Sequence, residues 1–112
     1  MEIPVEIRLS TLGLAAKAGK LVYGTQFVCE GLQAKKVVAV IEAAGTGPNT
    51  AKRLRDRCAF YEIPLYLCSA DAEALGRALG KGPIAAVGLS DASFARAIIE
   101  HPKNDSAEKQ NP

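Results

Sequence analysis

The stretch "VVAVIEAA", residues 37–44, decides the fold. It is a continuous apolar run rich in β-branched residues, which is typical of a buried central strand with both faces covered. The "GTGPN" that follows it breaks the run with residue types that favour turns. The chain has 112 residues, 48% of them hydrophobic, and it is therefore long enough to enclose one core around this strand.

Downstream of this strand, the sequence predicts helices and strands in alternation. Apolar residues recur at helical spacing in the segments we predict as helices, and short apolar runs predict the strands. Polar residues that cap helices stand before each helix; they are Asn49, Ser69 and the pair Ser90-Asp91. The predicted elements are helices at 49–61, 70–79 and 92–99 and strands at 63–68 and 84–89.

Upstream of residue 37, the pattern predicts two helices joined by a short strand. The first helix spans residues 5–18 and ends at Gly19. "LVY", residues 21–23, is long enough only for a stub of strand. A second helix runs from residue 25 to about residue 34, and we predict Thr25 as its N-cap.

This alternation predicts an α/β protein built as a three-layer α-β-α sandwich. Residues 1–100 form a single domain, and the polar residues 101–112 are predicted to be a disordered tail. No apolar run approaches the roughly 20 residues of a membrane helix. The start of the chain has no pattern of a signal peptide, so we expect a cytoplasmic protein without a membrane partner.

The residues that carry catalysis or bind metals are sparse and scattered. The three cysteines, Cys29, Cys58 and Cys68, form no CxxC pair, and we predict buried reduced thiols. His101 is the single histidine and belongs to the polar tail. We therefore predict no metal, no cofactor and no enzymatic activity, because acid–base and nucleophilic catalysis need a paired base.

Three glycine-rich stretches resemble phosphate loops only in part. "GLAAKAGK", residues 13–20, has the wrong glycine spacing and lies in a predicted helix. "GTGPNT", residues 45–50, lacks the third glycine of a dinucleotide site, and "GKGP", residues 80–83, is a simple turn. An enzyme acting on a small phosphorylated ligand would depend on "GTGPNT" alone.

Positive charge is concentrated in the first half of the chain. Residues 1–60 hold nine Lys and Arg against five Asp and Glu, whereas residues 61–112 hold five against seven. This imbalance indicates one positive face or an ordinary solvated surface. Lys17 and Lys20 precede the helix start at Gly24, where free backbone N–H groups attract anions, and these three elements are expected to converge.

Four stretches of the sequence are similar to one known family. They are "LGLAAKAGKLVYG" at 12–24, "NTAKRLRDRC" at 49–58, "IPLYLCS" at 63–69 and "ALGRALGKGPIAAVGLSDASFARAI" at 74–98. The chain resembles the kink-turn RNA-binding ribosomal proteins of the large-subunit seven-Ae type, and most closely the short bacterial YlxQ-type members. This resemblance implies a four-stranded mixed sheet with "LVYG" at its edge, and it implies RNA as the partner.

The resemblance also implies which residues meet the RNA. In the family, the second helix begins with Gly-x-Asn-Glu and has a lysine three residues later, and this set reads sheared G·A pairs. Gly24 and Thr25 match this pattern, and Gln26 keeps an amide in the asparagine place. Phe27 replaces the glutamate and Glu30 replaces the lysine, which weakens base readout.

A second segment completes the site that the resemblance implies, and two functions stay open. The loop at 80–83 corresponds to one that covers a flipped-out base. RNA binding with weakened base readout is the first hypothesis, and a protein-interaction module using the second-helix face is the alternative. Phe27 would anchor a protein partner if exposed, although its spacing favours the core. The residues predicted to contact RNA are Lys17, Lys20, Gly24, Thr25, Gln26, Phe27, Glu30, Lys52, Lys81 and Gly82.

Overall fold

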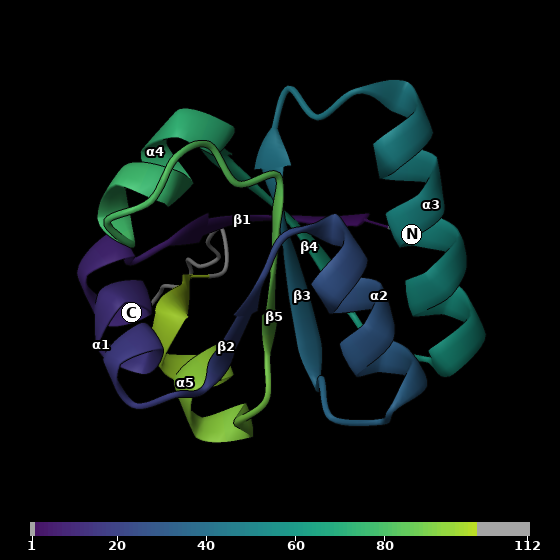
Figure 1. Ribbon diagram of the computed structural model, residues 1–112, viewed down its shortest axis with the longest axis horizontal. Helices are drawn as coiled ribbons and strands as arrows, with labels where there is room; N and C mark the ends of the chain where they lie inside the picture. The colour runs from purple at the N-terminus through teal and green to yellow at the C-terminus, as the bar shows by residue number, and fades with distance from the viewer. Residues whose placement is uncertain (1, 101–112) are drawn as a thin grey trace, which may run out of the picture.

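The computed structural model describes residues 2–100; the tail that we predict to be disordered, 101–112, lies outside the described residues. Five helices alternate with strands along most of the chain (Figure 1). The elements are β1 Glu2–Ile7, α1 Leu9–Lys17, β2 Leu21–Tyr23, α2 Thr25–Gln33, β3 Ala39–Ala44, α3 Pro48–Tyr61, β4 Leu65–Asp71, α4 Ala72–Ala78, β5 Ala86–Leu89, α5 Ala92–Ile98 and β6 Ile99–Glu100.

The strands form one mixed sheet in the order β2-β5-β3-β4-β1-β6. β3 pairs parallel with β4 and antiparallel with β5, so the strand predicted from residues 37–44 is central, as expected. The short strand β2 lies at the edge and pairs antiparallel with β5. The edge position of "LVYG" is therefore confirmed.

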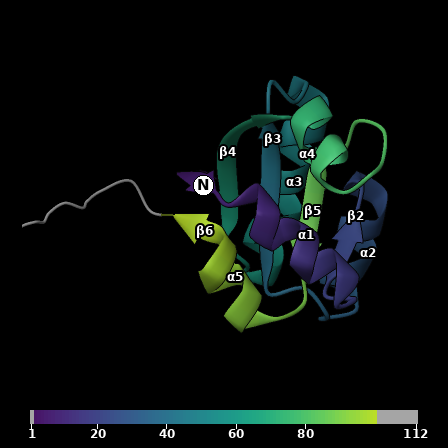
Figure 2. The same ribbon diagram turned by 90° about the vertical axis from the view of Figure 1, so that its left-hand side faces the viewer.

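Helices cover both faces of this sheet, which confirms the three-layer sandwich (Figures 1 and 2). Along β3, Ile41 packs with α1, α4 and α5, whereas Val40 on the opposite face packs with α2 and α3. Both residues are fully buried. The alternation of side chains along a strand thus divides the core into two clusters, one on each face.

The prediction of the first helix is wrong for its initial residues, which belong to a strand. This strand also makes the sheet larger than the resemblance implied. Residues 2–7 form β1, which pairs parallel with β4 and antiparallel with β6, so the sheet has six strands and not four. Ile3, Val5 and Ile7 alternate with polar or proline positions, and Val5 is buried in the core. This period of two favours a strand, and α1 begins only after Arg8.

Two of the predicted helix caps are displaced toward a preceding glycine. Gly24 is the N-cap of α2, and Thr25 is the first helical residue. Gly47 precedes α3, and Asn49 lies inside its first turn. Neither helix has a side-chain cap, so their first N–H groups stay available to other acceptors.

The two following helices are capped by aspartate. β4 continues through Ser69 to Asp71, and the Ala74 amide donates to Asp71 Oδ1 at 2.9 Å. The prediction of Ser69 as the cap is wrong because that residue is still in the strand. Asp91 caps α5 as predicted, accepting from the amide of Ser93 at 2.8 Å.

Two glycines let α2 lie close to the sheet. A Cβ at Gly31 would lie 2.6 Å from Val37 Cγ2, and a Cβ at Gly88 of β5 would lie 2.8 Å from Val22 Cγ2. Such distances do not occur between real side chains, so any larger residue at either position displaces α2 or the valines. The position of α2 on β2 and β5 depends on these glycines.

The three cysteines are free and buried, which confirms the prediction of buried thiols. Burial raises the pKa of Cys58 to about 11. Among residues 2–100 no group of three or more His, Cys, Asp or Glu side chains is placed to hold a metal ion. Within the same residues, none of the helices has the length and apolar character needed to cross a membrane.

Glu42 is a buried carboxyl in the middle of the central strand. It is 3% exposed, and its Oε1 has no hydrogen-bond partner among the described residues. Burial raises the pKa of Glu42 to about 7; the carboxyl of Glu2 adds to this rise, and the guanidinium of Arg55 opposes it. Arg55 in turn pairs with Glu2 at 3.6 Å, so β1, β3 and α3 meet at this cluster.

We predict that the free energy of unfolding falls as the pH rises from about 4.5 to about 7. The folded state binds the Glu42 proton more tightly than the unfolded chain, so this contribution is complete below pH 4.5 and lost above the folded pKa. Glu42→Gln should flatten that slope and be more stable than wild type at alkaline pH, by about 1–3 kcal/mol. Urea unfolding across this range measures the effect. The exposed Glu62→Gln serves as the control, and equal pH profiles for all three proteins would contradict the prediction.

Candidate nucleic-acid interface

The start of α2 is an open helix N-terminus at the edge of the sheet. Gly24 has a φ of 90°, which only glycine adopts freely, and its amide donates to the Ala86 carbonyl at 2.9 Å. The first helical bond runs from the Val28 amide to the Gly24 carbonyl. In residues 2–100, no acceptor meets the amides of Thr25, Gln26 or Phe27. Three N–H groups at the positive end of the helix therefore lack an acceptor within the described residues.

The loop at 80–83 is held against α4 by a close backbone approach. The Gly76 carbonyl accepts from the amides of Leu79 and Lys81, at 3.0 and 2.8 Å. A Cβ at Gly76 would overlap the Gly82 carbonyl oxygen and lie 2.6 Å from its carbon. Gly80, with a φ of 69°, makes the turn. Glycines thus allow the close approach of the loop to α4.

Lys81 links this loop to the end of β2. Its Nζ lies 4.9 Å from the centre of the Tyr23 ring, in a cation–π contact. Tyr23 directly precedes Gly24, so the contact brings the loop beside the start of α2, although 58 positions separate the two residues in sequence. Sequence reasoning missed Tyr23 and Gly76; the only local signals were an aromatic next to a glycine turn and a glycine inside a helix.

Gln26 and Phe27, at the start of α2, differ from the base-reading residues that the resemblance implies. They differ in residue type and also in their surroundings. The Gln26 amide nitrogen donates to Glu30 Oε2 at 3.3 Å, which occupies part of its hydrogen-bonding capacity. Phe27 is 61% exposed, so the interpretation of Phe27 as a core residue is wrong. It lines a hollow of about 420 Å³ between α2 and β2, together with Leu21 and Val22.

The remaining predicted lysines do not all gather at this helix start. Lys17 ends α1 and Lys20 precedes β2, whereas Gly24 follows β2, as Figure 1 shows. At about 3.3 Å per strand residue, Lys20 and Gly24 are roughly 13 Å apart, so the expected convergence is not met for Lys17 and Lys20. Lys52 on α3 pairs with Asp56 at 2.7 Å, which lowers the pKa of that carboxyl.

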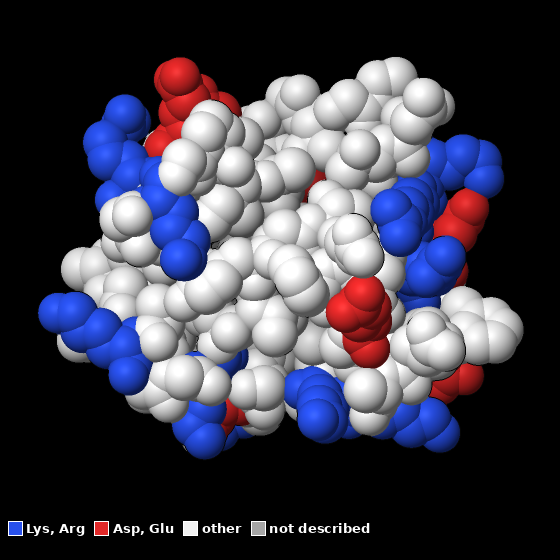
Figure 3. All heavy atoms as spheres, viewed as in Figure 1, with Lys and Arg blue, Asp and Glu red and all other residues white. Residues whose placement is uncertain are grey.

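The distribution of charge on this side of the molecule is uneven. Figure 3 shows Lys and Arg side chains along α3 and around the rim, while the central area over β2 and the start of α2 is largely uncharged. The helix start is therefore a polar, amide-bearing area bordered by cations.

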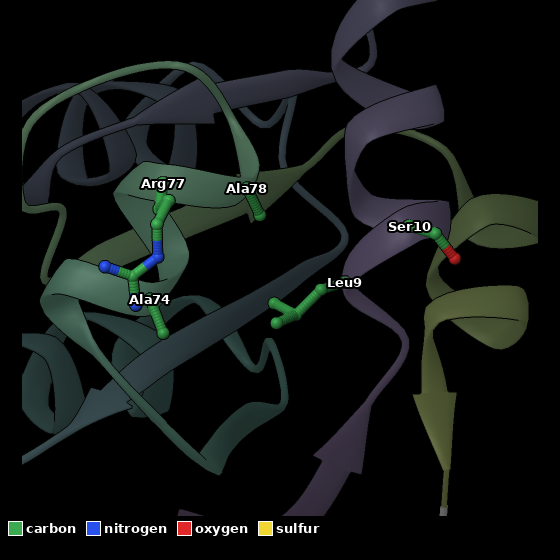
Figure 4. A pocket seen from close by; sticks show the side chains of 5 residues that line it. All are labelled: Leu9, Ser10, Ala74, Arg77 and Ala78. Carbon is green, nitrogen blue, oxygen red and sulfur yellow. The ribbon is translucent and has the colours of Figure 1, made fainter.

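A separate hollow lies between α1 and α4, on the opposite layer of the sandwich. It has a volume of about 330 Å³ and is lined by Leu9, Ser10, Ala74, Arg77 and Ala78. Figure 4 shows Leu9 pointing toward α4 and Ser10 pointing away from it. Small apolar side chains dominate this hollow, and it does not join the surface around the start of α2.

Comparison with known proteins identifies the family. The sequence pattern of the "Ribosomal protein L7Ae/L30e/S12e/Gadd45 family" matches residues 8–98. The chain belongs to this family. The match to this L7Ae family begins at the end of β1 and includes both the start of α2 and the loop at 80–83.

Two curated relatives and two solved structures are similar to the chain. The "RNA-binding protein YlxQ" of Bacillus subtilis (strain 168) is 33% identical, over 79% of this chain and 87% of its own. The protein of the same name from Enterococcus faecium is 31% identical, over 82% and 87%. A protein of unknown function from Bacillus halodurans has a TM-score of 0.74 at 40% identity, covering 79% of this chain and 88% of its own.

The fourth similarity concerns the fold alone. The Giardia lamblia 15.5kD RNA binding protein superposes with a TM-score of 0.68 at 20% identity, covering 80% of this chain and 76% of its own. At this identity the two chains share an architecture, and no residue of the site is transferred from it. The Giardia protein thus shares the fold at low sequence identity, whereas the YlxQ proteins also resemble this chain in sequence.

We predict that Gly76→Ala displaces the loop at 80–83 and destabilises the protein by about 1–3 kcal/mol, because its Cβ meets the Gly82 backbone. The Lys81 contact with Tyr23 should be lost, which shifts the Tyr23 ring resonances in an NMR spectrum. Gly82→Ala is the matched control, since a Cβ there meets nothing within 4 Å. Equal stability of the two variants, with unchanged Tyr23 resonances, would contradict the account.

Proposed function

We propose that the chain binds structured RNA of the kink-turn class through the start of α2, Tyr23 and the loop at 80–83. The observation that carries the proposal is the set of open amides at Thr25, Gln26 and Phe27 beside Lys81. Amides at a helix start bind phosphate oxygens, and a neighbouring lysine adds a positive charge. The names of the YlxQ relatives, which are RNA-binding proteins, support the same partner.

In this proposal, contacts to the RNA backbone dominate over base readout. Gly24 has no side chain, so a phosphate approaches the amides closely. Gln26 reaches a base edge only if it exchanges its bond to Glu30 for one to the RNA. Phe27 offers no hydrogen bond, and each missing base contact removes about 1–3 kcal/mol of discrimination. We expect the affinity to depend on the shape of the RNA more than on its base sequence.

The other predicted cations have secondary roles in the proposal. Lys52 contributes less than Lys81 because Asp56 neutralises it locally. Lys17 and Lys20 contact the RNA only if one of its helical arms extends past β2. Because the family includes ribosomal proteins, we propose ribosomal RNA in the cytoplasm as the first target to test.

The test is titration of a kink-turn RNA at about 50 and 200 mM salt. Each phosphate that a lysine or arginine neutralises should weaken binding about 3.5-fold over this fourfold rise in salt, so three such contacts would weaken it roughly 40-fold. Lys81→Ala should weaken binding several-fold at low salt. Arg96→Ala, on α5 of the opposite layer, removes the same charge and should change little. Absence of binding at low salt, or equal effects of the two variants, would reject the proposal.

Exposure of Phe27 favours a second candidate, a protein-interaction module on the same fold. Phe27 and the hollow beside β2 offer an apolar anchor of the kind that protein interfaces use. The same RNA titration separates the candidates. Phe27→Ala should leave RNA affinity within about twofold if phosphates dominate, whereas a protein complex anchored by this ring should lose tenfold or more, since hot-spot truncations cost about 2 kcal/mol.

A further inference from the structure

The groove between α2 and α3 carries an exposed aromatic ring that the site described above does not use. Phe60, near the end of α3, is 76% exposed. It contacts Tyr61 in a T-shaped arrangement with ring centres 4.8 Å apart, which restricts the orientation of the ring. A hollow of about 490 Å³ lies beside it, lined by Gln33, Asp56, Arg57, Phe60 and Tyr61.

Two arginines without an ion-pair partner among residues 2–100 lie on the same side of α3 as Phe60. Arg53, Arg57 and Phe60 follow one another at spacings of four and three residues, which places them on one face of the helix. Among residues 2–100, neither arginine takes part in an ion pair, whereas Lys52 and Arg55 on the other flank are paired with Asp56 and Glu2. Two guanidinium groups without an ion-pair partner among these residues therefore lie on the helix face that carries the exposed ring, and of the two, Arg57 lines the hollow.

The side of α2 that faces α3 carries two glutamines, whose side-chain amides form hydrogen bonds readily. Gln26 and Gln33 lie seven residues, or about two turns, apart on α2, and Gln33 lines the hollow with Arg57 and Phe60, whereas Glu30 lines the hollow between α2 and β2. α2 and α3 lie side by side and run in the same direction, as Figure 1 shows. At 1.5 Å per residue, Gln33 lies about 10 Å beyond Gln26 along α2, so an RNA strand that leaves the proposed site reaches the hollow within that length.

We propose that this groove holds an unpaired RNA segment that leaves the kink-turn site, with a base stacked on Phe60 and phosphates on Arg53 and Arg57. This inference rests on the proposed function and extends it to a second, single-stranded element of the target. Aromatic stacking together with guanidinium contacts is the usual chemistry of unpaired RNA recognition. A length of about 10 Å accommodates roughly three stacked nucleotides at about 3.4 Å each.

Two acidic groups border the groove and determine the path of the strand. Asp56 lines the hollow, but Lys52 Nζ lies 2.7 Å from its carboxylate and neutralises it. Glu30 has no cation partner within residues 2–100, so the strand passes on the α3 side of the groove, beside the arginines. An acidic protein segment with an apolar side chain would meet the same arginines and the same ring, so a protein partner is one of the outcomes of the test.

The test compares a blunt kink-turn RNA with the same RNA carrying a three-uridine tail at its 5′ or 3′ end. Wild-type protein should bind one tailed RNA at least fivefold more tightly than the blunt one. Phe60→Ala and Arg57→Ala should abolish this gain and leave the affinity for the blunt RNA unchanged, and Phe60→Trp should restore it. Leu14→Ala and Arg96→Ala are matched controls from the opposite layer, because Leu14 is 58% exposed on α1.

The outcomes separate this inference from the proposed function. Tight binding of the blunt RNA with no gain from either tail overturns the groove proposal, leaves the α2 site intact and points to a protein partner for the groove. A gain that survives Phe60→Ala and Arg57→Ala also overturns it. Binding of an unpaired uridine oligonucleotide that depends on Phe60, without binding of the blunt RNA, supports the groove and rejects the α2 site. Absence of binding to all these RNAs rejects both.

Discussion

The absence of side chains at Gly31 and Gly88 sets how closely α2 approaches the sheet. With no Cβ at either position, Val37 and Val22 fill the space between the helix and β5. This close packing holds the first turn of α2 beside the edge strand, where the Gly24 amide bonds to Ala86. The amides that follow have no partner among the described residues. The position of the proposed RNA-binding surface thus depends on two core positions that have no room for a side chain.

A second glycine contact builds the other side of the same surface. Gly76 allows the backbone of the loop at 80–83 to lie against α4, and this places Lys81 over Tyr23. Both halves of the surface are therefore set by backbone geometry, which tolerates changes in the exposed side chains. In the proposed function, this chain of the L7Ae family therefore offers phosphates its backbone amides, while Phe27 and Glu30 occupy positions to which the resemblance assigns base readout.

The parts of the fold that sequence predicts are those fixed by local pattern. β3 is predictable because its apolar run is continuous and buried on both faces. β1 is not, because the alternation of Ile3, Val5 and Ile7 is short and merges with the helix-forming residues of α1. β1 pairs with β4, which is distant in the sequence, and no local sequence pattern predicts this pairing. The contact between Lys81 and Tyr23 belongs to the same class, whereas the burial of Glu42 follows from its place in the continuous apolar run of β3.

The candidate site is predictable in its location but not in its details. A glycine before a helix indicates open amides, and the structure places them at Gly24 as expected. Sequence proximity wrongly suggested that Lys20 joins them, because a strand carries the chain away by about 3.3 Å per residue. The exposure of Phe27 depends on how the helix is rotated on the sheet, and no local pattern around Phe27 predicts that rotation.

The most direct test of the account is an amide NMR titration of the ¹⁵N-labelled protein with a kink-turn RNA. The account predicts that the largest shifts, with downfield movement of hydrogen-bonded protons, occur at the amides of Thr25, Gln26 and Phe27, accompanied by shifts at Lys81 and Gly82. Saturable binding that leaves these five amides unchanged and perturbs another surface would contradict it.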